Sequence, residues 1–237
     1  MEGEVECLDA TNGPAAGPMA KGFALRRRGA FIFMKFILAK KEGMTRVFSE
    51  DGRSVAATVL KTEPIVVTQV KTTDGKDKYS AIQVGYGARR AKTVSKAVLG
   101  HGKGKAYKVL REFRTDEVGS TAVGNEIQNT FAVGDTVKIS GVSKGKGFAG
   151  VVKRYGFKGG RRTHGQKHSE REAGSIGGGG RAGGRVAKGM RMAGRLGGER
   201  VTVKNLKVLA VDPSAGELVV SGAVPGVRGA VLEVISE

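Results

Sequence analysis

The feature of this sequence that most constrains its fold is an internal segment, residues 143–200, which is both glycine-rich and basic. It holds 18 of the chain's 39 glycines, 15 Lys or Arg residues and only three acidic residues. Its few large apolar side chains cannot build a core that offsets the roughly 1–2 kcal/mol of backbone entropy lost per ordered residue. We therefore expect the segment to be irregular, and mostly disordered in isolation.

Charge is concentrated in the same segment. The 237-residue chain has a formal net charge of +19, of which residues 143–200 contribute +12, residues 34–142 contribute +8 and residues 201–237 contribute −1. Such an excess attracts polyanions, of which nucleic acid is the commonest and an anionic membrane the competitor. A flexible linker is the plainer alternative, but linkers seldom carry so many cations. The charge distribution therefore predicts a nucleic-acid contact inside the chain, not at a tail.

The start of the chain imitates a signal peptide without fulfilling the pattern. Three arginines precede an apolar run, but Lys35 interrupts the run and no small-residue cleavage site follows. We therefore predict that Met34–Ala39 is the first strand and that residues 1–33 are a disordered leader or follow a mis-assigned start codon. No run approaches the roughly 18 apolar residues of a membrane span, so no membrane partner is expected.

Short segments rich in β-branched residues flank the basic segment on both sides, separated by turn signals such as Asp212-Pro213. This pattern predicts an antiparallel barrel or sandwich, built from 34–142 and 201–237, with 143–200 as an insertion anchored at both ends. One short helix is expected near Thr93–Leu99. Besides the first strand, the predicted strands are Ser54–Lys61, Ile65–Val70, Tyr79–Val84, Val109–Phe113, Thr136–Val142, Leu206–Val211, Glu217–Ser221 and Ala230–Ile235.

A G-x-G-x-x-G pattern lies within Ser143–Gly150 and follows a predicted strand. The residues after it are cationic and glycine-rich, however, and do not form the amphipathic helix that a dinucleotide site requires. The glycines of the pattern instead let backbone N–H groups approach phosphates, which Lys144 and Lys146 neutralise. Phe148 either stacks on a base or packs on the mouth of the barrel.

His164 and His168 have the spacing of a metal pair, yet Gly165 lies between them and the only cysteine is Cys7. We predict no metal, no cofactor, no catalytic residues and no small-molecule substrate, and hence no enzyme. The predicted RNA-binding residues are Lys144, Lys146, Phe148, Lys153, Arg154, Lys158, Arg161, Arg162, His164, Lys167, His168, Arg181, Arg185, Lys188, Arg191 and Arg195.

Several motifs resemble, in order and spacing, the bacterial large-subunit ribosomal protein L-three family. They are FILAKKEGMTRVF (36–48), SKGKGFAG (143–150), THG (163–165), GSIG (174–177), MAG (192–194), GERVTV (198–203) and GAVPG (222–226). The resemblance runs from Met34 to the C-terminus.

The resemblance implies a mostly β fold with a translation-factor-like β-barrel and a long, basic, glycine-rich extension. It implies a structural, non-enzymatic protein of the cytoplasmic ribosome that binds large-subunit rRNA, nucleates early assembly and sends residues 143–200 toward the peptidyl transferase centre. It also implies large-subunit proteins fourteen and nineteen as neighbours. Gly178 departs from the family, because some members have a methylated glutamine there. A free nucleic-acid-binding protein with a basic disordered arm is the alternative.

Overall fold

The computed structural model describes residues 35–48, 52–75, 77–115, 121–178 and 183–237. The predicted leader, Met34 and the predicted RNA contact Arg181 lie outside these ranges. The strands are β1 (Phe36–Phe48), β2 (Ser54–Thr62), β3 (Ile65–Lys71), β4 (Ala81–Ala88), β5 (Tyr107–Arg114), β6 (Glu126–Ile127), β7 (Thr136–Val142), β8 (Phe148–Ala149), β9 (Gly194–Arg195), β10 (Arg200–Asp212), β11 (Glu217–Ser221) and β12 (Val231–Ser236).

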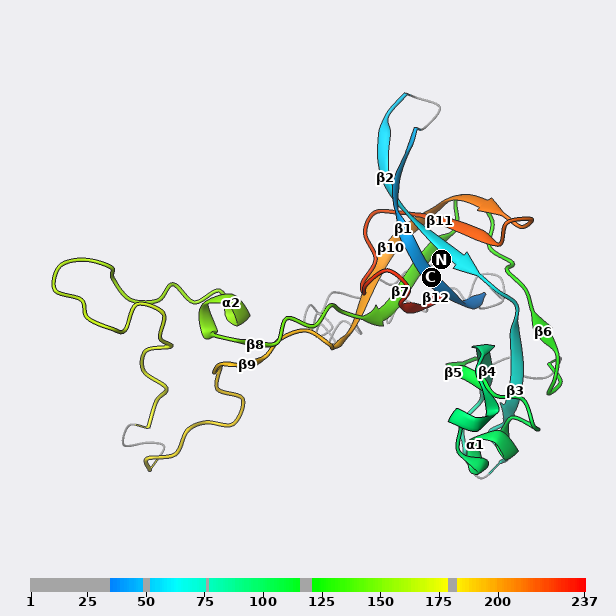
Figure 1. Ribbon diagram of the computed structural model, residues 1–237, viewed down its shortest axis with the longest axis horizontal. Coiled ribbons are helices and arrows are strands. Elements are labelled where there is room, and N and C mark those ends of the chain that lie inside the picture. The colour runs from blue at the N-terminus through cyan, green and yellow to red at the C-terminus, as the bar shows by residue number, and fades with distance from the viewer. Residues whose placement is uncertain (1–34, 49–51, 76, 116–120, 179–182) are drawn as a thin grey trace, which may run out of the picture. The chain divides into compact units, whose positions relative to one another are not determined.

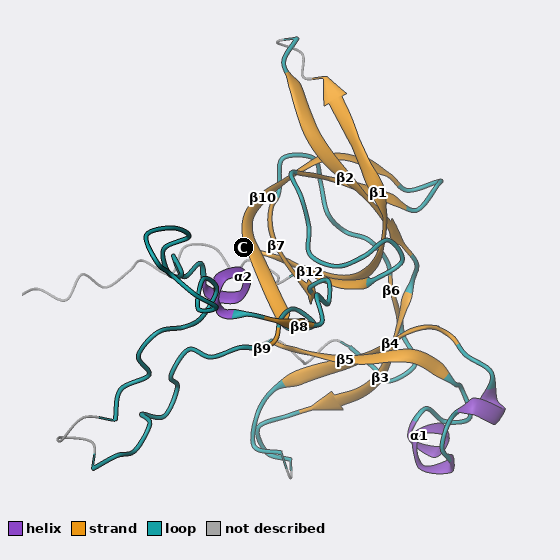
Figure 2. Cartoon of the chain, turned by 60° about the vertical axis from the view of Figure 1, so that its left-hand side comes forward, coloured by secondary structure: helices purple, strands orange, loops and turns teal. Residues whose placement is uncertain are grey.

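Six of these strands close on themselves in the order β1-β12-β7-β10-β11-β2, so that every strand has two antiparallel neighbours (Figure 2). The ring is completed by the described strands most distant in sequence: β1 pairs with β12 through Phe36↔Ile235 and the following residues. This topology is that of a closed barrel and confirms the mostly β, antiparallel prediction. Closure removes the exposed strand edges that invite aggregation.

The interior of the ring is filled by aliphatic side chains from all six strands. Ile37, Leu60, Ile139, Leu218 and Leu232 have no more than 1% of their surface exposed. Each strand contributes apolar residues to one core because the strands turn alternate side chains inward. Burial of this apolar surface stabilises the ring, at about 25 cal/mol for each Å² removed from water.

Not all of the predicted strands belong to the ring. The strands β3, β4, β5 and β6 form a second antiparallel sheet in the order β5-β4-β3-β6. Glu63 and Pro64 separate β2 from β3, and proline has no N–H to continue a ladder. Phe36 of β1 stacks on Phe113 of β5, with ring centroids 4.4 Å apart, and both belong to one core cluster. The second sheet therefore packs on the ring.

Helical structure is sparse among the described residues. A 3₁₀ turn (Ala91–Thr93) and helix α1 (Lys96–His101) occupy the region of the predicted helix. Helix α2 (Val151–Tyr155) directly follows the G-x-G-x-x-G pattern, where no helix was predicted, because Val151 and Val152 are β-branched residues that favour strands. At five residues it is too short to be the helix of a dinucleotide site. Gly156 ends this helix in the left-handed conformation, with φ +72°.

We expect Tyr86→Phe to leave stability unchanged or to raise it by up to about 1 kcal/mol, because the Tyr86 hydroxyl is buried without a hydrogen-bond partner in the described part of the chain. The side chain is only 3% exposed, and burial, aided by Glu63, raises the pKa of the phenol to about 12. Denaturant unfolding of both proteins measures the difference. A loss above about 1 kcal/mol would show that the hydroxyl has a partner after all.

Candidate nucleic-acid interface

The basic segment leaves the ring at the end of β7 and returns at the start of β10, where Val142 pairs with Arg200 (Figure 1). Its two arms stay hydrogen-bonded beyond the ring. Ser143 N–H donates to the Glu199 carbonyl at 2.8 Å, and Lys146 N–H donates to the Leu196 carbonyl at 2.8 Å. The residues between the ring and the β8–β9 pair, 143–147 and 196–199, form what we call the neck. The segment is therefore an insertion whose two arms are joined at its base.

Gly197 is required by the close approach of the two arms. It has φ +77°, and a Cβ atom added there would lie 2.1 Å from the Lys144 carbonyl oxygen. Real Cβ atoms essentially never come that near to a backbone oxygen. Glycine at this position therefore sets the spacing of the neck.

Beyond the neck, the first arm forms β8 and α2, and Arg154 of α2 contacts the returning arm. Its Nη1 donates to the Met192 carbonyl at 2.8 Å. The guanidinium of Arg154 lies 5.0 Å from the centroid of the Tyr155 ring, and that of Arg191 lies 5.8 Å from it. These cation–π contacts hold two cations of opposite arms around one aromatic ring. Arg154, predicted as an RNA contact, thus also links the two arms.

Residues 159–170 fold back on themselves. Gly160 N–H donates to the Glu170 carbonyl at 2.8 Å, and the Glu170 carboxylate forms an ion pair with Arg162, with 2.5 Å between Oε1 and Nε. His164 adopts a left-handed conformation with φ +59°. Both His164 and His168 are exposed, and no group of three or more metal-ligating side chains forms in the described ranges.

Most predicted contact residues are exposed on the segment. Arg154 is half-buried and Arg181 lies outside the described residues. Phe148 is 77% exposed, so its side chain does not pack on the ring and is free to stack on a base. The exposed members are Lys144, Lys146, Phe148, Lys153, Lys158, Arg161, Arg162, His164, Lys167, His168, Arg185, Lys188, Arg191 and Arg195.

Few of these cations are neutralised within the protein. Among the predicted contacts that the structure describes, only Arg162 pairs with a carboxylate. Only Ala149 and Val151 are buried in the described part of residues 143–200. The segment therefore has almost no core of its own and presents unpaired positive charge, as the composition predicted.

The contacts of Lys41 and Arg200, at the base of the segment, were not predicted from the sequence. Lys41 Nζ donates to the carbonyl oxygens of Val224 and Gly226, at 2.8 and 3.3 Å. Burial, and then the nearby charge of Lys144, lowers the pKa of this amine. Arg200 pairs with Glu233 of β12. No local signal marks these contacts, because the partners are far apart in sequence.

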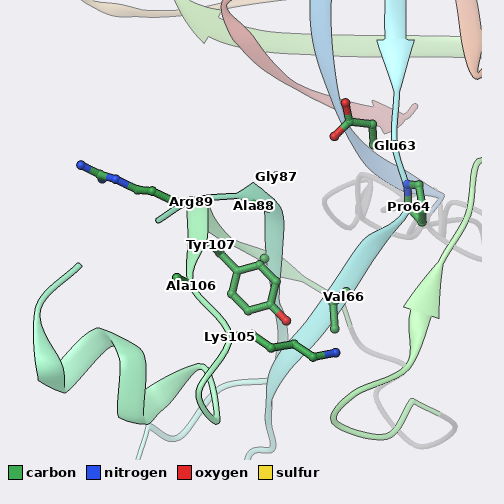
Figure 3. Close-up of a pocket in the computed structure, with 10 residues that line it drawn as sticks. Glu63, Pro64, Val66, Gly87, Ala88, Arg89, Lys105, Ala106 and Tyr107 are labelled. Atoms are coloured by element: carbon green, nitrogen blue, oxygen red, sulfur yellow. The ribbon is translucent and has the colours of Figure 1, made fainter. Parts of the chain in front are cut away.

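A hollow of about 540 Å³ lies outside this segment, beside the connection from β2 to β3 (Figure 3). Its polar side chains are those of Glu63, Arg89, Lys105 and Tyr107. They do not form a nucleophile–base pair or a carboxylate pair of the kind that catalysis requires. In the described part of the chain, no helix is both long and apolar enough to cross a membrane.

A closed β-ring that carries a long, exposed and basic insertion defines a class of protein built to bind a polyanion. The Ribosomal protein L3 family model matches residues 104–224, which include the whole basic segment. The large ribosomal subunit protein uL3 of Carboxydothermus hydrogenoformans is 46% identical over 202 residues, covering 84% of this chain and 95% of the relative. The protein of the same name from Cutibacterium acnes is 47% identical over 207 residues, covering 86% and 92%.

The chain belongs to the ribosomal protein L3 family, also called uL3. The resemblance found in the sequence motifs is thereby confirmed. The chain is a ribosomal protein and not an enzyme.

Proposed function

We propose that this protein is a structural constituent of the large ribosomal subunit and binds large-subunit rRNA directly through residues 143–200. The observation that carries the proposal is an exposed, unneutralised set of cations on a two-armed insertion fixed to a folded ring. Backbone phosphates bind such cations without regard to sequence, while exposed Phe148 offers a stacking surface to an unpaired base.

Within this proposal, the ring resembles the barrels of translation factors in its fold. It docks at the surface of the subunit while the insertion enters the rRNA toward the peptidyl transferase centre. Binding occurs early in assembly, with large-subunit proteins fourteen and nineteen as neighbours. Support comes from family membership and from the near absence of a core in the insertion, which suits folding on RNA. A free nucleic-acid-binding protein explains the charge, but not membership of a ribosomal family.

The contacts with RNA are tested by the double variant Arg185→Gln, Lys188→Gln, since neither side chain has an ion pair or hydrogen bond in the described structure. Arg191 is a poorer choice because it also contacts Tyr155. Loss of two phosphate contacts is expected to weaken binding to a large-subunit rRNA fragment roughly tenfold at moderate salt, and to lower the salt slope by about 1.4 to 1.8.

The matched control is Arg46→Gln, Arg53→Gln on β1 and the adjoining turn, which removes equal charge outside the insertion. The RNA affinity of this control is expected to stay within about twofold of that of the unmodified chain. Salt screens the attraction between RNA and surface charges that lie away from the interface. Equal losses in the two double variants would mean that only net charge matters and would contradict the placement.

A further inference from the structure

A second basic region lies outside the insertion. Residues 34–142 hold 19 basic and 11 acidic residues, yet residues 85–111 hold eight of the basic ones and none of the acidic ones. The remainder of 34–142 is therefore neutral overall. The positive charge outside the insertion is concentrated on the connection from β4 to β5, at the edge of the second sheet.

The cations of this region are not neutralised by carboxylates of the protein, although Arg89 Nε donates a hydrogen bond to Thr93 Oγ1 at 3.0 Å. Seven of them lie within residues 89–108, all are exposed, and none forms an ion pair within the described ranges. The next cations along the chain differ, because Arg111 pairs with Glu233 at 2.9 Å and Arg114 lies over the Tyr79 ring. The seven are Arg89, Arg90, Lys92, Lys96, Lys103, Lys105 and Lys108.

The turn that follows α1 has a fixed shape. Gly104 N–H donates to the Leu99 carbonyl at 2.9 Å, and Lys105 N–H donates to the Gly102 carbonyl at 3.0 Å. A Cβ added at Gly102 would lie 2.3 Å from the Lys105 carbonyl oxygen, so the turn admits only glycine there. Lys103 is held with φ +50°. A rigid turn presents its lysines to a partner at a smaller entropic cost than a flexible loop.

The arrangement does not suit a small anion. Arg89 and Lys105 both line the hollow beside β3, but Figure 3 shows their side chains extending in different directions, with Arg89 pointing away from Tyr107. Cations that diverge along an edge match an extended polyanion, whose charges are spread along a chain. Within a ribosomal protein, the extended polyanion at hand is RNA.

We propose that residues 89–108 form a second RNA-binding surface, which grips backbone phosphates separately from the insertion. Lys103, Lys105 and Lys108 are its centre, since Lys103 and Lys105 are held by the rigid turn and Lys108 lies at the start of edge strand β5. The inference rests on the proposed function, because it assigns RNA as the partner. Two anchors on one chain raise the overall affinity through effective concentration without new contacts at either anchor.

The test compares full-length chains by hydroxyl-radical footprinting and salt-dependent binding on large-subunit rRNA. The variant Lys103→Gln, Lys105→Gln, Lys108→Gln is expected to bind roughly 10- to 100-fold more weakly at moderate salt, with a salt slope lower by about 2 to 3. It should lose protection at nucleotides that the Arg185→Gln, Lys188→Gln variant still protects. The matched control, Lys61→Gln, Lys204→Gln, Lys207→Gln, removes three exposed lysines of the ring and should keep every protection.

Each other outcome counts against the inference. If the triple variant matches the ring control, or loses the same nucleotides as the insertion variant, the second surface is refuted while the proposed function stands. If the unmodified chain protects no rRNA, both fall together. If vesicles of anionic lipid bind the unmodified chain but not the triple variant, while RNA protections are unchanged, the surface belongs to a membrane. Unchanged thermal unfolding of the variant excludes misfolding as the cause of a loss.

Discussion

Replacing residues 143–199 with an Asn-Gly turn is expected to leave the ring folded and to weaken binding to large-subunit rRNA by at least about 10³-fold at moderate salt. The design follows from the register, because Val142 and Arg200 are directly paired across β7 and β10. A two-residue Asn-Gly loop joins strands paired in this way. The replacement lowers the formal net charge from +19 to +8.

The size of the effect follows from counterion release. If about ten of the 14 deleted cations meet phosphates, the slope of log affinity against log salt falls by roughly 7 to 9. A full-length variant with glutamine at those 14 positions separates charge from length, and it should lose nearly as much affinity. Circular dichroism and thermal unfolding report on the ring. Affinity unchanged by the replacement would remove the insertion from the RNA-binding role.

Gly197→Ala is expected to weaken RNA binding more than any other single substitution to alanine in the neck. A Cβ at Gly197 meets the Lys144 carbonyl oxygen, and both belong to backbone that hydrogen bonds hold in place. Relieving the contact forces the arms apart, so the hydrogen bond from Arg154 to the Met192 carbonyl, beyond the neck, is lost. We expect at least a tenfold loss of affinity, which is about 1.4 kcal/mol.

Gly198→Ala is the matched control for this substitution. Gly198 has φ +71°, close to that of Gly197, but a Cβ there meets nothing within 4 Å. Both variants therefore carry the left-handed strain of roughly 1–2 kcal/mol, and only Gly197→Ala adds the clash. Affinity and the proteolysis rate of the insertion are measured for both. Equal behaviour of the two variants would show that the spacing of the neck is unimportant.

The strands and the insertion could be predicted from the sequence because their signals are local. β-Branched runs such as Glu217–Ser221 and Thr136–Val142 coincide with observed strands, and the charge density of 143–200 requires only counting. The exposure of its cations follows from the shortage of apolar residues to cover them.

The division into two sheets could not be predicted, because it depends on which strands pair. Pro64 marks a break in the chain, but nothing local says that β3 leaves the ring for a second sheet. The same is true of the approach of Gly197 to Lys144, about fifty residues away in sequence, and of Arg154 to Met192. Residues 89–108 hold seven basic residues and no acidic residue, which the sequence shows directly, but the net charge of 34–142 as a whole conceals this concentration.

Directed hydroxyl-radical probing tests most directly whether the insertion lies within large-subunit rRNA. With Cys7, the chain's one cysteine, changed to serine, Ser175→Cys places an iron–EDTA probe on an exposed residue of the insertion, and Thr45→Cys places one on β1. In assembled subunits, the probe at 175 is expected to cleave large-subunit rRNA strongly, at nucleotides distinct from those cut by the probe at 45. Subunits that contain the protein but show no cleavage from position 175 would show that the insertion does not lie within the rRNA.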